Sequence, residues 1–198
     1  MELQIRPYHA SDLPALIRVC LLTGANGDDA SGLYQDPDLL GLYFVAPYVT
    51  FEPELCFVLT LDGRPCGYIL GTHDSALFAS RCERDWFPNL RHRYPPPVES
   101  DKSMDAWVIR LVHAGSGANS IRADYSAHLH IDILPIGQGL GWGRALMNRF
   151  LAQLRHDGVQ GLHLRVGKSN IRAVEFYRRL GFALLDETEK TFLYGQRL

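Results

Sequence analysis

A glycine-rich stretch in the C-terminal half of the chain decides the fold: Leu134-Pro135-Ile136-Gly137-Gln138-Gly139-Leu140-Gly141-Trp142-Gly143-Arg144-Ala145. Polar and apolar residues alternate before it, over 128–134, which predicts a strand, and apolar residues at helical spacing after it predict a helix. Such a turn can direct consecutive backbone N–H groups into one concavity at the positive end of a helix dipole. Glycine there lets a ligand approach the backbone. The stretch predicts an anion site suited to a pyrophosphate, with a tight structural turn as the alternative.

Two common glycine-rich phosphate sites do not match this stretch. A dinucleotide-binding G-x-G-x-x-G needs a third glycine and an acidic residue about 20 positions on, at the end of the next strand. Here Arg144 stands at the third glycine position of 139–144, and the next strand ends in Arg165-Val166-Gly167-Lys168. A P-loop needs Gly-Lys-Ser/Thr, whereas Gly143 is followed by Arg144-Ala145. Both interpretations are therefore excluded.

The remaining pattern predicts strands and helices that follow one another along the chain, in the α/β or mixed α+β class. Strands are expected at 3–6, 56–61, 66–71, 128–134, 161–166, 182–185 and 191–194. Helices are expected from the N-cap Ser11 to Gly24, over 38–45, after the glycine-rich stretch, and over 170–180. Residues 75–122 hold two further helical patterns, separated by Tyr94-Pro95-Pro96-Pro97, and a flexible exit at 115–117. We expect a single domain over 1–198.

Composition excludes several classes of protein. The chain has 198 residues, of which 46% are hydrophobic and 21% charged, which is globular rather than disordered. Its formal net charge of -2 leaves no basic field for a nucleic acid, and no apolar run approaches the ~20 residues of a membrane span. We expect no nucleic-acid or membrane partner and a cytoplasmic location. The four cysteines, Cys20, Cys56, Cys66 and Cys82, are expected to be reduced and mostly buried.

The pattern Q-x-x-G-x-G directly after a strand that ends in proline resembles the core motif of the GNAT superfamily of N-acetyltransferases. A second family element, an Asn followed by Ala-x-x-Phe-Tyr and Leu-Gly-Phe, matches Asn170, 173–177 and 180–182 in order and spacing. The segment 75–122 is longer than the usual family connection and resembles a helical insertion. This insertion and the run 127–135 are similar to the acetyltransferase-like C-terminal domain of animal O-GlcNAcase and to its free-standing bacterial relatives. That animal domain has lost its acetyl-CoA site, but the glycine motif is intact here.

The resemblance implies a mixed central sheet with flanking helices, in which two central strands, 129–134 and 162–166, splay apart around the pantetheine arm of acetyl-CoA. The backbone of Ile133 and Leu134 would bond the pantetheine amides, and Asn170 would touch the same arm. Tyr177 matches the position that protonates the departing thiolate, since a phenol with a pKa of ~10 is protonated at neutral pH; packing of its ring is the alternative. The N–H groups from Gln138 to Arg144 would hold the pyrophosphate, with Gln138, Gly139, Gly141, Gly143 and Arg144 as the binding residues.

The family motifs do not identify the general base. His128, His130 and Asp132 share one face of their strand. Asp132 lies nearest the expected thioester and is the candidate base or amine anchor, provided that burial raises its pKa; a purely structural carboxylate is the alternative. In that alternative, proton transfer would run through water to Tyr125 or a histidine. The same three residues could bind Zn²⁺, but no spacing supplies further ligands, so we expect no metal.

These features predict transfer of an acetyl group from acetyl-CoA to a primary amine by direct attack in a ternary complex. A backbone N–H near Leu134 would hold the oxyanion. The alternative is a non-catalytic module that binds acyl-CoA or a protein. The acceptor would be a small molecule or a peptide, and the insertion could cover its site. Residues that could line a pocket for a cationic amine are Asn26, Asp28, Asp29, Tyr34, Tyr48, Tyr125 and Asp132.

Overall fold

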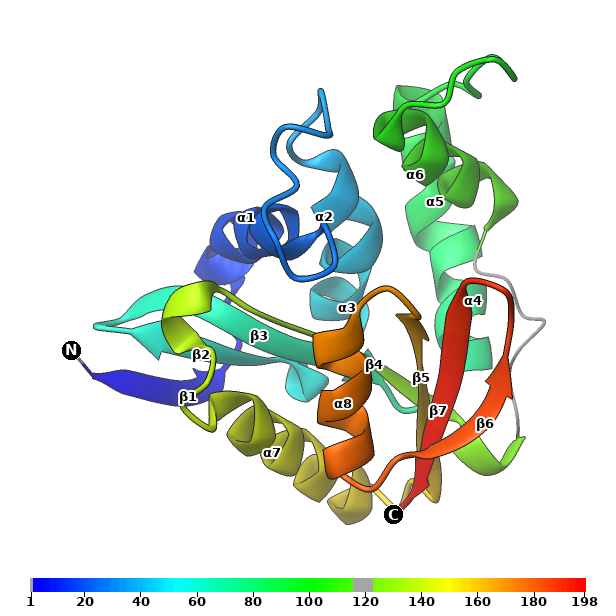
Figure 1. Ribbon diagram of the computed structural model, residues 1–198. Helices are drawn as coiled ribbons and strands as arrows, with labels where there is room; N and C mark the ends of the chain where they lie inside the picture. Colours follow the sequence, from blue (N-terminus) through cyan, green and yellow to red (C-terminus); the bar gives the residue numbers. More distant parts are fainter. Residues whose placement is uncertain (1, 116–122) are drawn as a thin grey trace.

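A seven-stranded mixed sheet forms the centre of the computed structural model, which describes residues 2–115 and 123–198 (Figure 1). The strands are β1 (Leu3–Pro7), β2 (Phe57–Leu61), β3 (Arg64–Thr72), β4 (Ala127–Ile133), β5 (Gly161–Gly167), β6 (Ala183–Glu187) and β7 (Thr191–Arg197). Their order is β1-β2-β3-β4-β5-β7-β6, and every neighbouring pair is antiparallel except β4 and β5. The predicted mixed α/β class is therefore confirmed.

Helices cover both faces of this sheet. One face carries α1 (Leu13–Thr23), α2 (Leu39–Phe44), α3 (Ala46–Phe51), α4 (Ser75–Arg81), α5 (Phe87–Arg93) and α6 (Met104–Ala114). The other face carries α7 (Trp142–His156) and α8 (Ile171–Arg179). Each layer buries its own apolar core, and all four cysteines are free and buried, as expected. No helix among the described residues is long and apolar enough to cross a membrane.

Most of the predicted elements are confirmed, and the differences have local causes. The start of the first helix is a short 3-10 turn, Ala10–Asp12, whose cap is His9 rather than Ser11. Asp12 is buried, and its carboxylate accepts two hydrogen bonds from the Arg6 guanidinium, of 2.7 and 2.8 Å. Helix α3 was not predicted, because its six residues show no polar face. Of the predicted exit at 115–117, positions 116 and 117 lie outside the described residues.

The central strands β4 and β5 separate after a short pairing. Their parallel register joins Ala127 to Leu162 and His128 to His163, and no later pair is formed among the described residues. On the other edge of β4 the ladder with β3 continues, and the Leu134 N–H donates to the Cys66 carbonyl at 2.8 Å. Hydrogen-bonding direction alternates along an antiparallel strand, so 131 and 133 direct their backbone groups toward β5 instead. These groups face the gap that the splay opens.

Candidate active site

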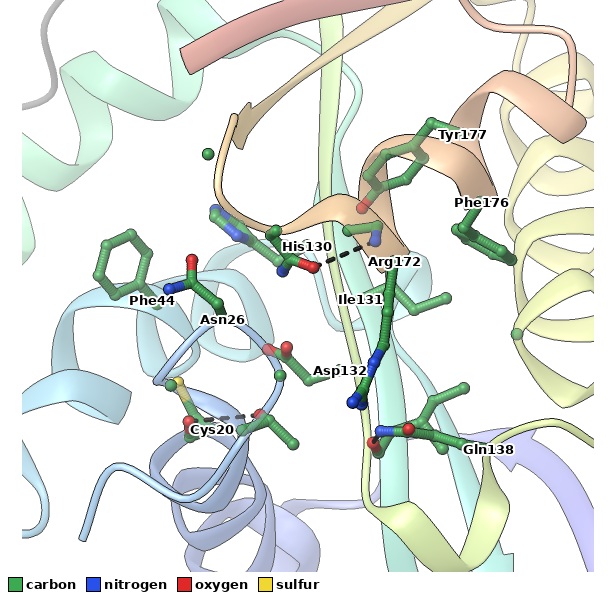
Figure 2. A pocket seen from close by; sticks show the side chains of 18 of the residues that line it. Cys20, Asn26, Phe44, His130, Ile131, Asp132, Gln138, Arg172, Phe176 and Tyr177 are labelled. Carbon is green, nitrogen blue, oxygen red and sulfur yellow. Dashed lines mark hydrogen bonds between the residues drawn. The ribbon is translucent and has the colours of Figure 1, made fainter. Parts of the chain in front are cut away.

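A pocket of about 830 Å³ lies at this splay and passes through the sheet from one helical layer to the other. Figure 2 shows Cys20, Asn26, Phe44 and Asp132 on one side of it, and Gln138, Phe176 and Tyr177 on the other. The walls come from the end of α1 and the loop after it, α2, α6, β4, the glycine-rich turn, the end of β5, and α8. The pocket therefore joins the predicted pyrophosphate site to the opposite face of the sheet.

Two glycines of the turn leave open space in front of the backbone. Gly139 and Gly141 have φ values of +73° and +86°, and a Cβ placed on either would meet no atom within 4 Å. Helix α7 begins next to them, with Gly141 as its N-cap and no capping side chain. The first-turn N–H groups at 142–144 therefore remain available to an anion. Gly139, Gly141 and the N–H groups at 142–144 together form an open backbone surface at a helix N-terminus, the glycine cradle. Such a surface suits a pyrophosphate, so the residues present fit the CoA diphosphate.

The other two glycines serve packing rather than ligand access. A Cβ on Gly137 would lie 2.8 Å from Ile133 Cγ2, so the turn could not rest on β4. A Cβ on Gly143 would lie 3.2 Å from the Phe176 ring, where α7 and α8 approach each other. Gly143 still lines the pocket through its backbone, whereas Gly137 does not.

The backbone groups of Leu134 and Gln138, which were predicted to bind the cofactor, have partners within the protein. The Leu134 N–H donates to Cys66, and its carbonyl accepts the Gly137 N–H at 2.9 Å, so neither group faces the splay. The Gln138 N–H donates to the Pro135 carbonyl at 3.2 Å within the same 3-10 turn. The Gln138 side chain turns back and donates to the Ile133 carbonyl at 2.7 Å. The register with β3 fixes the direction of the Leu134 N–H, and the 3-10 turn after β4 fixes that of the Gln138 N–H. The residues whose backbone faces the cleft are therefore 131 and 133.

Helix α8 brings two predicted residues to the pocket. Asn170 is its N-cap, and its side-chain oxygen accepts the Ala173 N–H at 3.1 Å, so only its Nδ2 group can donate to a ligand. Tyr177 is buried and lines the pocket. Burial raises the pKa of Tyr177 above its ordinary value, and the charge of Asp132 raises it further. The phenol is therefore protonated at neutral pH, as a proton donor must be.

Asp132 lies on β4 and lines the pocket from the α1 side. The Tyr68 hydroxyl donates to its carboxylate at 2.5 Å. Burial raises the pKa of Asp132 to about 6, although the bond from Tyr68 acts in the opposite direction. A carboxyl group with this pKa is mostly ionised at neutral pH and still basic enough to accept a proton.

The two histidines on the same face have different surroundings. His128 is held at both nitrogens, by Tyr48 Oη at 2.7 Å and by Ser75 Oγ at 2.7 Å, and burial lowers its pKa well below the usual value. Neither nitrogen remains for a metal or a proton, so His128 is structural. His130 lines the pocket with its ring against Phe44, and burial lowers its pKa to about 4. His130 is therefore neutral at physiological pH.

The residues proposed for the acceptor pocket are only partly brought together. Asn26 and Tyr34 line it beside Asp132, whereas Asp28 and Asp29 do not line it. Tyr48 is buried against His128, and Tyr125 packs on Gly161 and Gly195 at the far end of β5 and β7. The lining residues that sequence reasoning missed include Cys20, Thr23, Phe44 and Trp107.

One signal for the acceptor loop was present in the sequence. Asn26 and Gly27 have φ values of +58° and +95°, and Ala25 and Asp28 exchange both backbone hydrogen bonds around them. This is the two-residue turn that Asn-Gly favours. The stretch predicted as an ordinary polar loop is thus a tight turn that presents Asn26 to the pocket.

A cluster of acids and a histidine lies outside the pocket. Among the described residues, Glu52, Glu54 and His73 have ligand-type atoms within 4.8 Å of one another. The His73 ring already bonds Glu52 at 2.7 Å and Asp157 at 2.9 Å, so the geometry is that of a hydrogen-bonded ion network. It connects the start of α4 to the end of α7.

Comparisons with known proteins agree with this geometry. The Acetyltransferase (GNAT) family model matches residues 28–182. The crystal structure of SsHAT is 38% identical, with a TM-score of 0.93 over 100% of this chain and 98% of that chain. Protein O-GlcNAcase of Rattus norvegicus is 28% identical over 182 residues, which cover 89% of this chain.

The chain spans about a fifth of the O-GlcNAcase length, 20%. A PaiA N-acetyltransferase from Thermoplasma acidophilum, crystallised in complex with coenzyme A, shares the fold at 15% identity, with a TM-score of 0.59 over 100% of both chains. The family model covers most of the chain. The chain therefore belongs to the acetyltransferase (GNAT) family.

Proposed function

We propose that the chain transfers the acetyl group of acetyl-CoA to a primary amine by direct attack in a ternary complex. One observation carries this proposal: a single pocket is lined by the glycine cradle and Tyr177 on one side and by Asp132 on the other. A cofactor on the first side and an amine on the second would meet at the splay without a covalent enzyme intermediate. The acceptor is a small molecule or a peptide with a free amine.

The cofactor side supplies backbone donors and one amide side chain. The N–H groups at 142–144 and the open space at Gly139 and Gly141 would hold the diphosphate. Ile131 directs its backbone groups into the splay, where a pantetheine amide can pair with them as an added strand would. The Ile133 carbonyl already accepts a hydrogen bond from the Gln138 side chain, which leaves the Ile133 N–H for the thioester oxygen. The Nδ2 group of Asn170 would donate to the same arm, and Arg144 lines the pocket beside the cradle.

The catalytic residues would then act as follows. Asp132 accepts a proton from the ammonium, which frees the nitrogen lone pair for attack. The new C–N bond forms as the C–S bond breaks, and the Ile133 N–H stabilises the charge that develops on the carbonyl oxygen. The Tyr177 hydroxyl gives its proton to the leaving sulfur, and the second proton that the nitrogen loses on becoming an amide passes to solvent, from which Tyr177 is reprotonated. Its raised pKa and the pKa of about 6 at Asp132 set the acid and the base in the correct protonation states at pH 7.

A thiol-release assay tests this proposal directly. The purified chain is mixed with acetyl-CoA and with sets of small primary amines and short peptides, and free CoA is measured against an amine-free control. We expect amine-dependent thiol release together with a matching acetylated amine in mass spectrometry. Calorimetric binding of acetyl-CoA without thiol release for any amine would instead indicate a non-catalytic acyl-CoA-binding module.

A further inference from the structure

An aromatic wall lines the pocket on the side of Asp132. Trp107 of α6 and Phe44 of α2 stack at 6.3 Å with an interplanar angle of 24°, and Phe44 meets the ring of His130 edge-on at 5.4 Å. All three rings line the pocket. Trp107 is 43% exposed, so part of its ring surface is open to a ligand in the pocket. The wall thus offers apolar area to whatever enters the pocket.

Charge is sparse among the lining residues that α1, α2, α6 and β4 contribute, whereas Arg172 of α8 reaches this side of the pocket, with its guanidinium 4.0 Å from the Asp28 carboxylate. Among the described lining residues contributed by α1, α2, α6 and β4, Asp132 is the only ionised side chain at neutral pH, because burial keeps His130 neutral. The amine end of an acceptor must therefore lie at Asp132, which is also where the reacting carbon would be reached. The rest of the acceptor then lies on the rings of Phe44 and Trp107.

The wall also argues against a peptide in this position. A peptide chain carries a donor and an acceptor at every residue, and burying these groups against aromatic rings costs free energy. Besides Asp132 and the neutral His130, the polar side chains on the acceptor side are Asn26, Tyr34 and Thr23, whose hydroxyl already donates to the Val19 carbonyl at 2.8 Å. An apolar ring, by contrast, pairs with Phe44 and Trp107 in stacked or edge-on geometry.

We infer that the acceptor is a small primary amine that carries a planar aromatic group on a short spacer, and that Trp107 determines this specificity. The inference rests on the proposed function for the direction in which the amine points. Trp107 comes from the helical segment between β3 and β4, so this segment would supply one wall of the acceptor site rather than only cover it.

Calorimetry with the full chain in the presence of CoA tests the inference without turnover. The probes are 2-phenylethylamine and n-butylamine, which are both primary amines but differ in the ring. We expect phenylethylamine to bind about tenfold more tightly, as ring burial predicts. Trp107→Ala should weaken phenylethylamine binding more than n-butylamine binding and so remove this preference. Trp107→Phe should retain most of the preference, and it serves as the test variant if the alanine variant unfolds.

Leu77→Ala is the matched control, because Leu77 is 51% exposed on α4 of the same segment and does not line the pocket. It should behave as the wild type. Equal binding of the two amines by the wild type, tighter binding of a free-amine tetrapeptide, or an undiminished preference in both Trp107 variants would each overturn the inference. Turnover is measured separately. Phenylethylamine that binds through Trp107 but is not acetylated refutes only the proposed function. Equal kcat/KM values for the two amines refute only the aromatic specificity.

Discussion

The two sides of the pocket are built in different ways. The cofactor side comes mainly from two continuous segments, 131–144 and 165–179, and it holds its ligand mainly through backbone groups at a strand edge and a helix N-terminus. The acceptor side is assembled from α1, α2, α6 and β4, and it relies on side chains that are far apart in the sequence. Backbone recognition suits a cosubstrate that a whole family shares, whereas side-chain recognition can change with the acceptor. Substitutions on the cofactor side and on the acceptor side should therefore have different effects on binding and turnover.

The largest effect is expected at the cradle. Gly141→Leu should weaken acetyl-CoA binding at least ~100-fold by calorimetry, because the side chain would project into the open space over the helix N-terminus. Gly158, just beyond the other end of α7, is the matched control: it has φ +77° and equally open surroundings. Gly158→Leu carries the same backbone strain of about 1–2 kcal/mol but no ligand. If both variants bind acetyl-CoA alike, the cradle is not the diphosphate site.

The next effect separates chemistry from binding on the cofactor side. Tyr177→Phe removes one hydroxyl and keeps the ring that packs against Phe182. Loss of the proton donor should lower kcat about 100-fold, while acetyl-CoA affinity stays within about twofold. Steady-state kinetics and calorimetry on the same preparation check both. An unchanged kcat would leave Tyr177 a packing residue.

On the acceptor side, Asp132→Asn should lower kcat/KM for amines by about 10- to 100-fold. The wild-type profile should lose activity as the pH falls through about 6, the value to which burial raises the pKa of Asp132. This limb should be absent from the variant. A limb that persists in Asp132→Asn would assign the titration to another group.

The same variant should be more stable than the wild type. A buried carboxyl whose pKa lies near 6 in the folded chain and near 4 unfolded destabilises the fold when ionised, by roughly 3 kcal/mol above pH 6. The cost vanishes as the pH falls below ~4, because both states are then protonated. Asp132→Asn should therefore raise the free energy of unfolding at pH 7.5 but not at pH 4, in urea titrations. A variant that is less stable at pH 7.5 would indicate a structural carboxylate.

The smallest effect concerns the network that joins the two helical layers. Burial lowers the pKa of His73, but its hydrogen bonds to Asp157 and Glu52 outweigh this, so its pKa is raised. The protonated His73 therefore stabilises the folded chain fully below pH ~6.5, and this stabilisation is lost as the pH rises through the raised pKa of His73. His73→Gln should lower the free energy of unfolding by about 1 kcal/mol at pH 6, and by less at pH 9. His92→Gln, on an exposed site of α5, is the control. A pH-independent loss would contradict the role of the charge.

Much of the cofactor side could be predicted from the sequence because its determinants are local. The glycine spacing of 137–143, the N-cap Asn170 and the position of Tyr177 all lie within a few residues of the elements that present them. The partners of the Leu134 and Gln138 backbone groups could not be predicted, because the direction of these groups depends on the register with β3 and on a 3-10 turn. Neither the register nor the 3-10 turn can be predicted from composition or residue spacing.

The sequence by itself determined the mixed sheet, the layout of most helices, the family and the cradle, since periodicity and turn residues act over short distances. Only the tertiary structure decided the acceptor side. Packing of α1 on β4 removes water from Asp132 and so sets its pKa, and the meeting of α2 with α6 brings Phe44 to Trp107. Desolvation and contact between distant segments are properties of the packed chain, and no local pattern encodes them.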